Sequence, residues 1–389
     1  MKQDRRGFLK GVAPLILPAA ARGANDRPAF GAIGVGNRGF WLHETFQKLG
    51  AQCVAVCDVY EPFRDRAKAA SAPGAKAYVN HKDLLAHKGL DFVMIATPDH
   101  HHCPMLMDSL AAGKDVYIEK PLSLNLEESA RMVEAARTSD RIIQVGMHRR
   151  SMPFVRKAVQ VVKEGALGRI SMVKAMWNWH FDIPLDNSPL PGALDWELFQ
   201  GPAPRRALQP KFFRWWRGFW AYSGGNMTDQ GTHLMDVVQW MTDSGPPRSA
   251  VCQGTIFNAT EGEVPDVFCA AFEYPGFLAT WTLNYGSSQD YDWSILFQGE
   301  KASMLLDRTG YRIFRDPGAS PRPWTQSGKV EIIAQEPDRD SATAHQQNFL
   351  DCIRSRRQPN CTVEIAAAAV AGPHMANLAY RQGRRVTAG

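Results

Sequence analysis

Two titratable side chains, Asp229 and His233, stand four residues apart in the stretch GGNMTDQGTHLMD. The glycines break the chain, Thr228 can cap a helix, and a helix starting there places both side chains on one face. An imidazole accepts or donates a proton near neutral pH, so the pair could supply a general base or acid. The same pair could equally be a core histidine held by a neighbouring aspartate.

A third candidate is Lys120 in the stretch YIEKPLSL, where Glu119 and Lys120 end an expected strand and Pro121 stops its ladder. Lysines at strand ends are usually surface residues. Inside a crevice, the ammonium can instead donate to a substrate hydroxyl and stabilise a developing alkoxide. Lysine and imidazole together offer the groups needed to oxidise a secondary alcohol.

The stretch GVGNRG follows a short apolar strand and precedes a helical pattern, as a dinucleotide-binding turn does. Gly34 would make the tight turn and Gly36 would let the backbone approach a pyrophosphate. Gly39 would pack the helix on the strand, with Asn37 and Arg38 between the two glycines.

Asp58 ends the next expected strand, 19 residues after Gly39. A carboxylate there can bind both hydroxyls of an adenosine ribose and repel a 2′-phosphate, which favours NAD over NADP. Arg64, six residues further on, leaves NADP as the open alternative.

Strand-like apolar runs and helical patterns alternate through the first part of the chain. This order predicts an α/β Rossmann domain over residues 25–150, a parallel sheet with helices on both faces. Ligands bind at the carboxyl ends of such strands. One crevice should therefore be bordered by the residues that follow strand ends, namely Asp58, Thr97, Pro98, Glu119, Lys120 and His148.

The strand-like runs after residue 150 mostly alternate between apolar and polar residues and are joined by short turns. They predict an α+β domain over residues 151–389 with an open, mainly antiparallel sheet. Two helices, near residues 344–355 and 363–381, should close the chain.

In this order and at these separations, GVGNRG, ATPDHHH, EKPLSL and GGNMTDQGTHLMD resemble the Gfo/Idh/MocA oxidoreductases, and the resemblance covers everything after residue 27. It implies that Glu119 binds the nicotinamide ribose, that Lys120 contacts this ribose and the substrate, and that Asp229 positions substrate. It makes His233 the base or acid, and places His102 where the family has a histidine after the Thr-Pro turn. It also implies association through the open sheet, as a homodimer or homotetramer.

Aromatic residues crowd the stretches WNWHF and KFFRWWRGFWAYSGG on either side of this motif. Aromatic rings stack on sugar rings, although packing in the core accounts for at least half of such side chains. Composition and resemblance both suggest a sugar or glycoside substrate. The residues expected to line its pocket are Arg149, Trp179, His180, Arg217 and Tyr222.

Several classes of partner are disfavoured. The formal net charge is +6, of which +4 lies in the first 24 residues, too little elsewhere for nucleic acid. Apolar runs are too short to span a membrane. The run His100, His101 and His102 does not predict a metal site, because adjacent residues rarely face one ion and no cysteine or acid completes a set.

The first 24 residues have the features of an N-terminal targeting signal. Residues 4–10, DRRGFLK, resemble a twin-arginine export signal, followed by a short apolar run and small residues for cleavage. A basic tail before a short helix is the alternative. We expect a periplasmic or otherwise exported protein. Export would allow Cys352 and Cys361 to pair, but the seven cysteines contain no C-x-x-C and are expected to be buried free thiols.

An exported enzyme meets no metabolic NAD pool, so the cofactor should stay bound and be recycled. One hypothesis is a sugar oxidoreductase that returns the hydride to a second substrate. Another is an NAD-dependent glycosidase, which borrows the hydride for oxidation, elimination, hydration and reduction. The intact Glu-Lys-Pro motif favours the oxidoreductase, because the family's glycosidases mostly lack it. A non-catalytic sugar-binding protein is the third hypothesis, disfavoured by the intact Lys120, Asp229 and His233.

Overall fold

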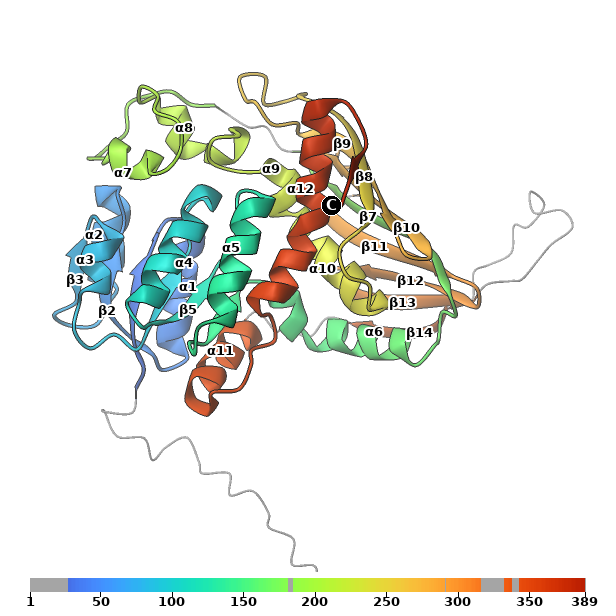
Figure 1. The fold of residues 1–389 in the computed structure, drawn as a ribbon, viewed down its shortest axis with the longest axis horizontal. Helices are drawn as coiled ribbons and strands as arrows, with labels where there is room; N and C mark the ends of the chain where they lie inside the picture. Colours follow the sequence, from blue (N-terminus) through green and yellow to red (C-terminus); the bar gives the residue numbers. More distant parts are fainter. Residues whose placement is uncertain (1–26, 181–184, 291, 316–331, 338–342, 389) are drawn as a thin grey trace, which may run out of the picture.

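Two β-sheets lie side by side, and helices fill the space between them (Figure 1). The computed structural model describes residues 27–180, 185–290, 292–315, 332–337 and 343–388. The expected twin-arginine leader lies outside these residues. The predicted fold class is confirmed, since one sheet is wholly parallel and the other mainly antiparallel.

The first sheet has six parallel strands. In spatial order they are β3 (Lys76–Tyr78), β2 (Gln52–Cys57), β1 (Ala29–Ile33), β4 (Phe92–Ile95), β5 (Asp115–Ile118) and β6 (Ile143–Val145). Every residue of β4 and β5 is buried, as expected for apolar strands covered on both faces. The strand order reverses between β1 and β4, which is where such sheets bind ligands.

The helices of this domain follow the predicted alternation. They are α1 (Asn37–Lys48), α2 (Glu61–Ala69), α3 (His81–Leu85), α4 (His102–Ala111) and α5 (Leu126–Arg137), with the short 3-10 helices η3 (Asp99–His101) and η4 (His148–Ser151). Asn125 caps α5 by accepting a hydrogen bond from the backbone N–H of Glu128, which satisfies one free donor of its first turn.

The second sheet has nine strands. In spatial order they are β14 (Ile332–Pro337), β13 (Gly310–Arg315), β12 (Ala302–Asp307), β11 (Asp292–Gly299), β7 (Ile170–Asn178), β10 (Phe277–Asn284), β9 (Val267–Tyr274), β8 (Ser249–Thr255) and β15 (Val386–Thr387). All pairs are antiparallel except β7 with β10. Strands β13 to β15 and helix α6 (Pro153–Lys163) were not expected from the sequence.

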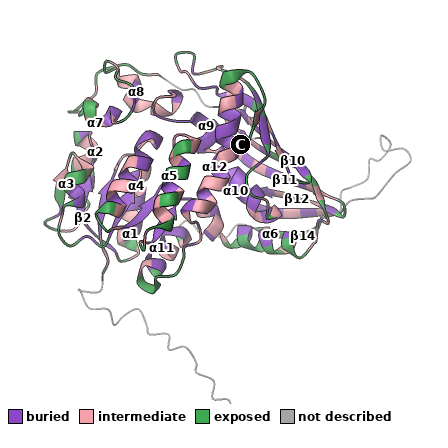
Figure 2. Ribbon diagram, in the orientation of Figure 1, coloured by how far each residue is buried: buried purple, intermediate pink, exposed green. Residues whose placement is uncertain are grey.

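One face of the second sheet packs on helices, and the other is open. Helices α6, α10 (Gly231–Thr242) and α12 (Val363–Gln382) share a core with the strands. Figure 2 shows buried residues concentrated on α10 and α12 where they face the strands. Along β10 buried residues alternate with more exposed ones, and Leu278 is 53% exposed, so the alternation in the sequence identified the covered face.

The segment between β7 and α10 crosses to the first domain. It contains α7 (Trp196–Gln200), α8 (Pro210–Arg214), η5 (Trp216–Gly218) and α9 (Gly225–Asp229). Its backbone is tied to the end of β2, because Asp195 N donates to Val59 O at 3.0 Å and Glu61 N donates to Ala193 O at 2.9 Å. In Figure 1, α7 and α8 lie above the helices and strands of the first domain.

Helix α11 (Ala344–Ser355) returns to the first domain. The ring of Phe349 packs edge-on against Phe92 at 5.2 Å and Tyr117 at 5.7 Å between centroids. Phe349 is fully buried in the same core as β1, β2 and β4. The last part of the chain therefore completes the core of the first domain.

All seven cysteines are free, including Cys352 and Cys361, as the sequence predicted. Six are buried, but Cys269 is exposed, so the expected burial is wrong for that thiol. Within the described ranges, no helix is both long and apolar enough to cross a membrane. The same residues contain no group of three His, Cys, Asp or Glu side chains placed to hold a metal ion.

Candidate active site

Two adjoining cavities open at the carboxyl end of the first sheet. The first has a volume of about 770 Å³ and is lined by the glycine turn, the end of β2, the start of η3 and the crossing segment. The second has a volume of about 490 Å³ and lies between the two domains. Arg38, Ala96 and Arg217 belong to both linings, so the cavities meet at these residues.

The glycine turn brings α1 directly against β1. Gly34 has φ of +75°, and a Cβ on Gly39 would lie 1.8 Å from the carbonyl oxygen of Gly34, so no side chain fits there. Helix α1 starts at Asn37 without a side-chain cap, beside the first cavity. Its first backbone N–H groups and its dipole suit a pyrophosphate.

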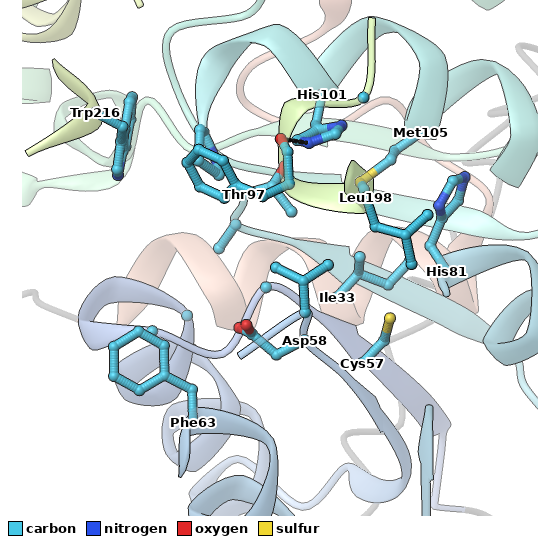
Figure 3. A pocket seen from close by; sticks show the side chains of 18 of the residues that line it. Ile33, Cys57, Asp58, Phe63, His81, Thr97, His101, Met105, Leu198 and Trp216 are labelled. Carbon is cyan, nitrogen blue, oxygen red and sulfur yellow. Dashed lines mark hydrogen bonds between the residues drawn. The ribbon is translucent and has the colours of Figure 1, made fainter. Parts of the chain in front are cut away.

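Asp58 borders the first cavity at the end of β2 (Figure 3). Its Oδ2 accepts a hydrogen bond from Val35 N at 2.8 Å and its Oδ1 accepts one from Tyr60 N at 2.9 Å. These bonds fix the carboxylate, although burial raises its pKa to about 6. Arg64 donates to the backbone oxygen of Asp58 and is not part of the cavity lining. The donor set fits NAD at this end of the cavity.

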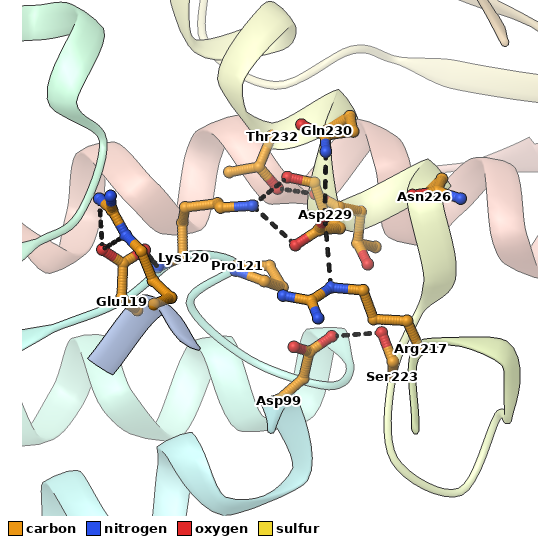
Figure 4. A network of polar contacts seen from close by, with 12 residues as sticks. Asp99, Glu119, Lys120, Pro121, Arg217, Ser223, Asn226, Asp229, Gln230 and Thr232 are labelled. Carbon is orange, nitrogen blue, oxygen red and sulfur yellow. Dashed lines mark hydrogen bonds and ion pairs between the residues drawn. The ribbon is translucent and has the colours of Figure 1, made fainter. Parts of the chain in front are cut away.

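The polar centre of the second cavity is an ion cluster around Asp229 (Figure 4). Lys120 Nζ lies 2.6 Å from Asp229 Oδ1 and donates to the backbone oxygen of Asp229 at 2.9 Å. Arg217 Nε lies 3.4 Å from Asp229 Oδ2. Burial alone would raise the pKa of Asp229, but Lys120 and Arg217 lower it to about 2. The carboxylate is therefore ionised and holds the lysine in place.

Glu119 is fixed at the junction of the cavities. Arg38 donates from Nε to Glu119 Oε1 at 2.9 Å, and Lys120 N donates to Glu119 Oε2 at 3.2 Å. A Cβ on Gly146 would lie 2.9 Å from the Glu119 carboxyl group, so glycine makes room for it. This places an oriented carboxylate beside the lysine.

His233 lines the second cavity, and its Nδ1 has no hydrogen-bond partner within the described part of the chain. The ring of His148 lies edge-on to it, 4.8 Å away between centroids. Burial, followed by the charges of Arg149 and Lys120, lowers the pKa of His233 well below its usual value. The ring is therefore neutral at pH 7 and able to accept a proton.

The expected single helix carrying Asp229 and His233 is wrong. Helix α9 ends at Asp229 and α10 begins at Gly231, with Gln230 between them. Thr228 lies inside α9 and bonds Gly225 O, so it caps neither helix. Both Asp229 and His233 nevertheless line the second cavity.

The predicted single crevice is resolved into these two cavities. The first is lined by Gly34, Gly36, Asn37, Arg38, Gly39, Asp58, Thr97 and Pro98. The second is lined by Arg38, Glu119, Lys120, His148, Arg149, Trp179, Arg217, Asp229 and His233.

Three predicted residues line neither cavity. Tyr222 is fully buried among the rings of Trp196 and Phe199, where its ring packs into an aromatic cluster. His180 is exposed and lies outside both linings. His102 is buried with Nδ1 2.7 Å from Pro121 O and Nε2 3.0 Å from Thr97 O.

His102 therefore supports the site indirectly. Burial lowers its pKa, and a neutral ring can donate only one of its two close contacts with backbone carbonyls. Either contact ties α4 to a strand end that borders a cavity. His100 and His101 both direct Nε2 at Phe199 O, each at 2.8 Å, which accounts for the histidine run.

Sequence reasoning missed several residues of the second cavity, among them Trp177, Trp215, Asn226, Tyr285, Trp293 and Arg308. Trp177 and Trp293 lie on β7 and β11, where the alternation of buried residues could have indicated them. The other four lie in the crossing segment or in turns that follow strands, where the sequence gives no such signal. It also missed Asp99, which is buried and accepts a hydrogen bond from Ser223 Oγ at 2.7 Å. Burial and the nearby Asp229 raise the pKa of Asp99 to about 7.

Two family models match the chain. One, described as an oxidoreductase family with an NAD-binding Rossmann fold, matches residues 29–147, and a GFO/IDH/MocA C-terminal domain matches residues 155–305. Together they cover more than half of the chain.

Curated relatives match only in part. A glycosyl hydrolase family 109 protein of Shewanella sp. (strain W3-18-1) is 32% identical over 173 residues, 41% of this chain and 36% of that protein. An inositol 2-dehydrogenase of Corynebacterium glutamicum (strain R) is 37% identical over 124 residues, 31% of this chain and 37% of that protein. The chain thus spans little more than a third of the length of these relatives.

Solved structures share the fold at low identity. The WlbA dehydrogenase from Bordetella pertussis, in complex with NADH and UDP-GlcNAcA, superposes with a TM-score of 0.71 at 22% identity, covering 93% of this chain and 99% of that one. A levoglucosan dehydrogenase in complex with NADH and levoglucosan superposes with a TM-score of 0.71 at 16% identity, covering 93% and 99%.

Proposed function

Because the chain belongs to the Gfo/Idh/MocA family of oxidoreductases, we propose that it transfers a hydride between NAD and a secondary hydroxyl carbon of a sugar or glycoside. One observation carries this proposal. Lys120 and His233, from different domains, line one cavity that adjoins the cavity of the glycine turn.

The chain's own residues supply binding, orientation and proton transfer. The start of α1 would hold the pyrophosphate, Asp58 the adenosine ribose, and Glu119 the nicotinamide ribose. NAD held by these residues would supply the acceptor for a hydride from the substrate carbon. His233 accepts the hydroxyl proton, and the ammonium of Lys120 stabilises the alkoxide that forms. A positioned acid or base of this kind contributes roughly 10²- to 10⁴-fold in rate.

Four tryptophans support a sugar as substrate. They are Trp177, Trp179, Trp215 and Trp293, and all line the second cavity. Ring faces that are not covered by the side chain of Arg149 can stack on the C–H faces of a pyranose while Asn226 and Gln230, also in the lining, bond its hydroxyls.

Residues 1–24 support a further part of the proposal, export by the twin-arginine route to the periplasm. That route carries folded proteins, so NAD would be loaded before export and recycled by a second substrate. The exposed side chains of Leu278 and Val251 on the open sheet support association into a homodimer or homotetramer.

The alternative is an NAD-dependent glycosidase, favoured by the partial match to glycosyl hydrolase family 109 proteins. In that cycle, oxidation of a sugar hydroxyl to a ketone acidifies the neighbouring C–H. Loss of that proton expels the glycosidic group, water adds to the double bond, and the hydride returns to the ketone. The net reaction is hydrolysis.

One experiment separates these functions. Nucleotide released from the purified protein is identified by mass spectrometry, and the protein is incubated with a panel of glycosides. Accumulation of keto-sugar or NADH supports the oxidoreductase, whereas released aglycone without net NADH supports the glycosidase. Sugar binding without either product contradicts both and indicates a non-catalytic sugar-binding protein.

A further inference from the structure

Positive charge exceeds negative charge in the second cavity. Its lining contains five cationic side chains, Arg38, Lys120, Arg149, Arg217 and Arg308, and two carboxylates, Glu119 and Asp229.

Four of the five cations have carboxylate partners. Arg38 pairs with Glu119, and Lys120 and Arg217 both pair with Asp229. Arg308 pairs with Asp292, which lies outside the lining.

Arg149 is the exception within the described residues. It forms no ion pair there, and its Nη1 is buried without a hydrogen-bond partner. The side chain is held between rings instead, with its guanidinium carbon 4.0 Å from the centre of Trp293 and 5.7 Å from that of Trp177. The faces of the tryptophan rings attract the cation, but they are not hydrogen-bond acceptors for the N–H groups in the plane of the guanidinium.

The neighbouring Arg150 shows what a structural arginine looks like here. It donates to Asp236 at 2.7 Å, and Asp236 is 1% exposed. Arg149 is similarly buried, with 3% of the residue exposed, but faces the cavity. Asp292 and Asp236 favour the charge of Arg149, but neither forms an ion pair with it. A buried cation without a direct ion-pair partner is costly, so the pairing anion is expected to arrive with a ligand.

We infer that the substrate carries a carboxylate, as in a uronic acid or uronide, and that the guanidinium of Arg149 binds it in the second cavity. This inference rests on the proposed function, because it names the substrate class of the same site. A planar guanidinium matches a carboxylate with two parallel hydrogen bonds. A sugar phosphate would bring a charge of about −2 to the single unpaired cation, so the match in charge favours the carboxylate.

The same contact would act on the base. After burial, Arg149 is the largest cause of the lowered pKa of His233, ahead of Lys120, His148 and Arg38. A carboxylate on Arg149 offsets that positive charge, so His233 becomes a stronger base when an acidic substrate is bound. Neutral sugars would leave the base weak.

The test compares matched ligands that differ only at one group. Calorimetry measures the binding of hexose glycosides, the corresponding uronides and the corresponding 6-phosphates to the NAD-loaded protein, and turnover is measured in parallel. We expect uronides to bind about 10- to 100-fold more tightly than neutral glycosides, the range of one or two charge-assisted hydrogen bonds.

Arg149→Gln should remove this preference, so that uronides bind no more tightly than the corresponding neutral glycosides. Arg312→Gln, which removes an arginine paired with Asp307 outside the cavity, is the matched control and should keep the preference. Arg149→Lys keeps the charge without the two-pronged geometry and should retain part of it.

Four outcomes would overturn the inference. In the wild type they are equal binding of uronides and neutral glycosides, tighter binding of phosphates, or no binding of any uronide. In Arg149→Gln it is an equal loss of binding for all ligands. Binding and turnover fail separately. Turnover of neutral glycosides without a uronide preference rejects the carboxylate and keeps the oxidoreductase. A uronide preference that depends on Arg149, without turnover, keeps the carboxylate inference and rejects the oxidoreductase.

Discussion

Lys120 follows strand β5 of the first domain, and its Nζ lies 2.6 Å from Oδ1 of Asp229 in the second domain. The two side chains are 13% and 6% exposed, so the contact is shielded from water. It links the two domains at the point where substrate is expected to bind, and it holds the lysine side chain at the cavity.

The contribution of this ion pair to stability should be measurable at acidic pH. The pKa of Asp229 is about 2 in the folded protein, below the roughly 3.9 of an unfolded aspartate. Its stabilising contribution is therefore complete above about pH 4 and is lost as the pH falls towards 2. Melting temperatures between pH 2 and 5 should fall less steeply in Asp229→Asn than in the wild type, and parallel curves would contradict the pairing.

His233→Asn should lower the rate of nucleotide reduction in a single turnover by about 10²- to 10⁴-fold, because it removes the proton acceptor. Asparagine keeps a polar side chain of similar size, so the fold and NAD binding should persist. Circular dichroism and nucleotide titration provide the controls. Wild-type rates in a folded, NAD-bound variant would reject His233 as the base.

Arg149→Gln should move the acidic limb of the kcat/KM profile to higher pH. The base must be neutral to act, so activity is lost below its pKa, and removing the Arg149 charge raises the pKa of His233 in the free enzyme. An unmoved limb would mean that another group limits the reaction at low pH.

Asp58→Asn should raise the ratio of NADP to NAD binding by about tenfold or more, because the repulsion of a 2′-phosphate disappears. The substitution keeps an acceptor for one of the two backbone N–H bonds that Asp58 receives. Fluorescence titration with both nucleotides measures the ratio. If it does not change, the adenosine ribose lies elsewhere.

Gly39→Ala should weaken nucleotide binding and lower stability by more than about 2 kcal/mol, because its Cβ would overlap the carbonyl of Gly34 at 1.8 Å. Gly245→Ala is the control, since a Cβ there meets nothing within 4 Å. Denaturant unfolding should separate the two variants clearly.

The same substitution should lower stability much more at Arg150 than at the neighbouring Arg149. Arg150→Gln leaves Asp236 buried without its partner and should cost about 3 to 5 kcal/mol of unfolding free energy. Arg149→Gln removes an unpaired charge, loses only its ring contacts, and should stay within about 2 kcal/mol of wild type. Similar losses in both would indicate that Arg149 is structural.

The sequence predicted the parts of the site that depend on local order. A parallel strand has its carboxyl end at one edge of the sheet, so Asp58, Thr97 and Lys120 could be placed there without coordinates. The turn geometry of Gly34 and Gly39 followed from the same local logic.

Long-range packing could not be predicted in the same way. Tyr222 and Trp215 lie in the same aromatic stretch, yet one fills a core and the other lines the cavity. Trp293 lies on β11 and Arg308 in the turn between β12 and β13, so both reach the cavity through the placement of the second sheet. The break at Gln230 was missed because a periodic pattern shows that a helix exists but not that two short helices share it.

Phe349 carries a consequence for the order of events during synthesis. Its ring packs against Phe92 and Tyr117, which are synthesised 257 and 232 residues earlier. The nucleotide-binding half leaves the ribosome first but is finished last, since until Phe349 emerges its interior has an empty place. We therefore expect NAD to bind stably only once Phe349 has been synthesised, and a nascent chain that stopped short of Phe349 to be susceptible to proteases.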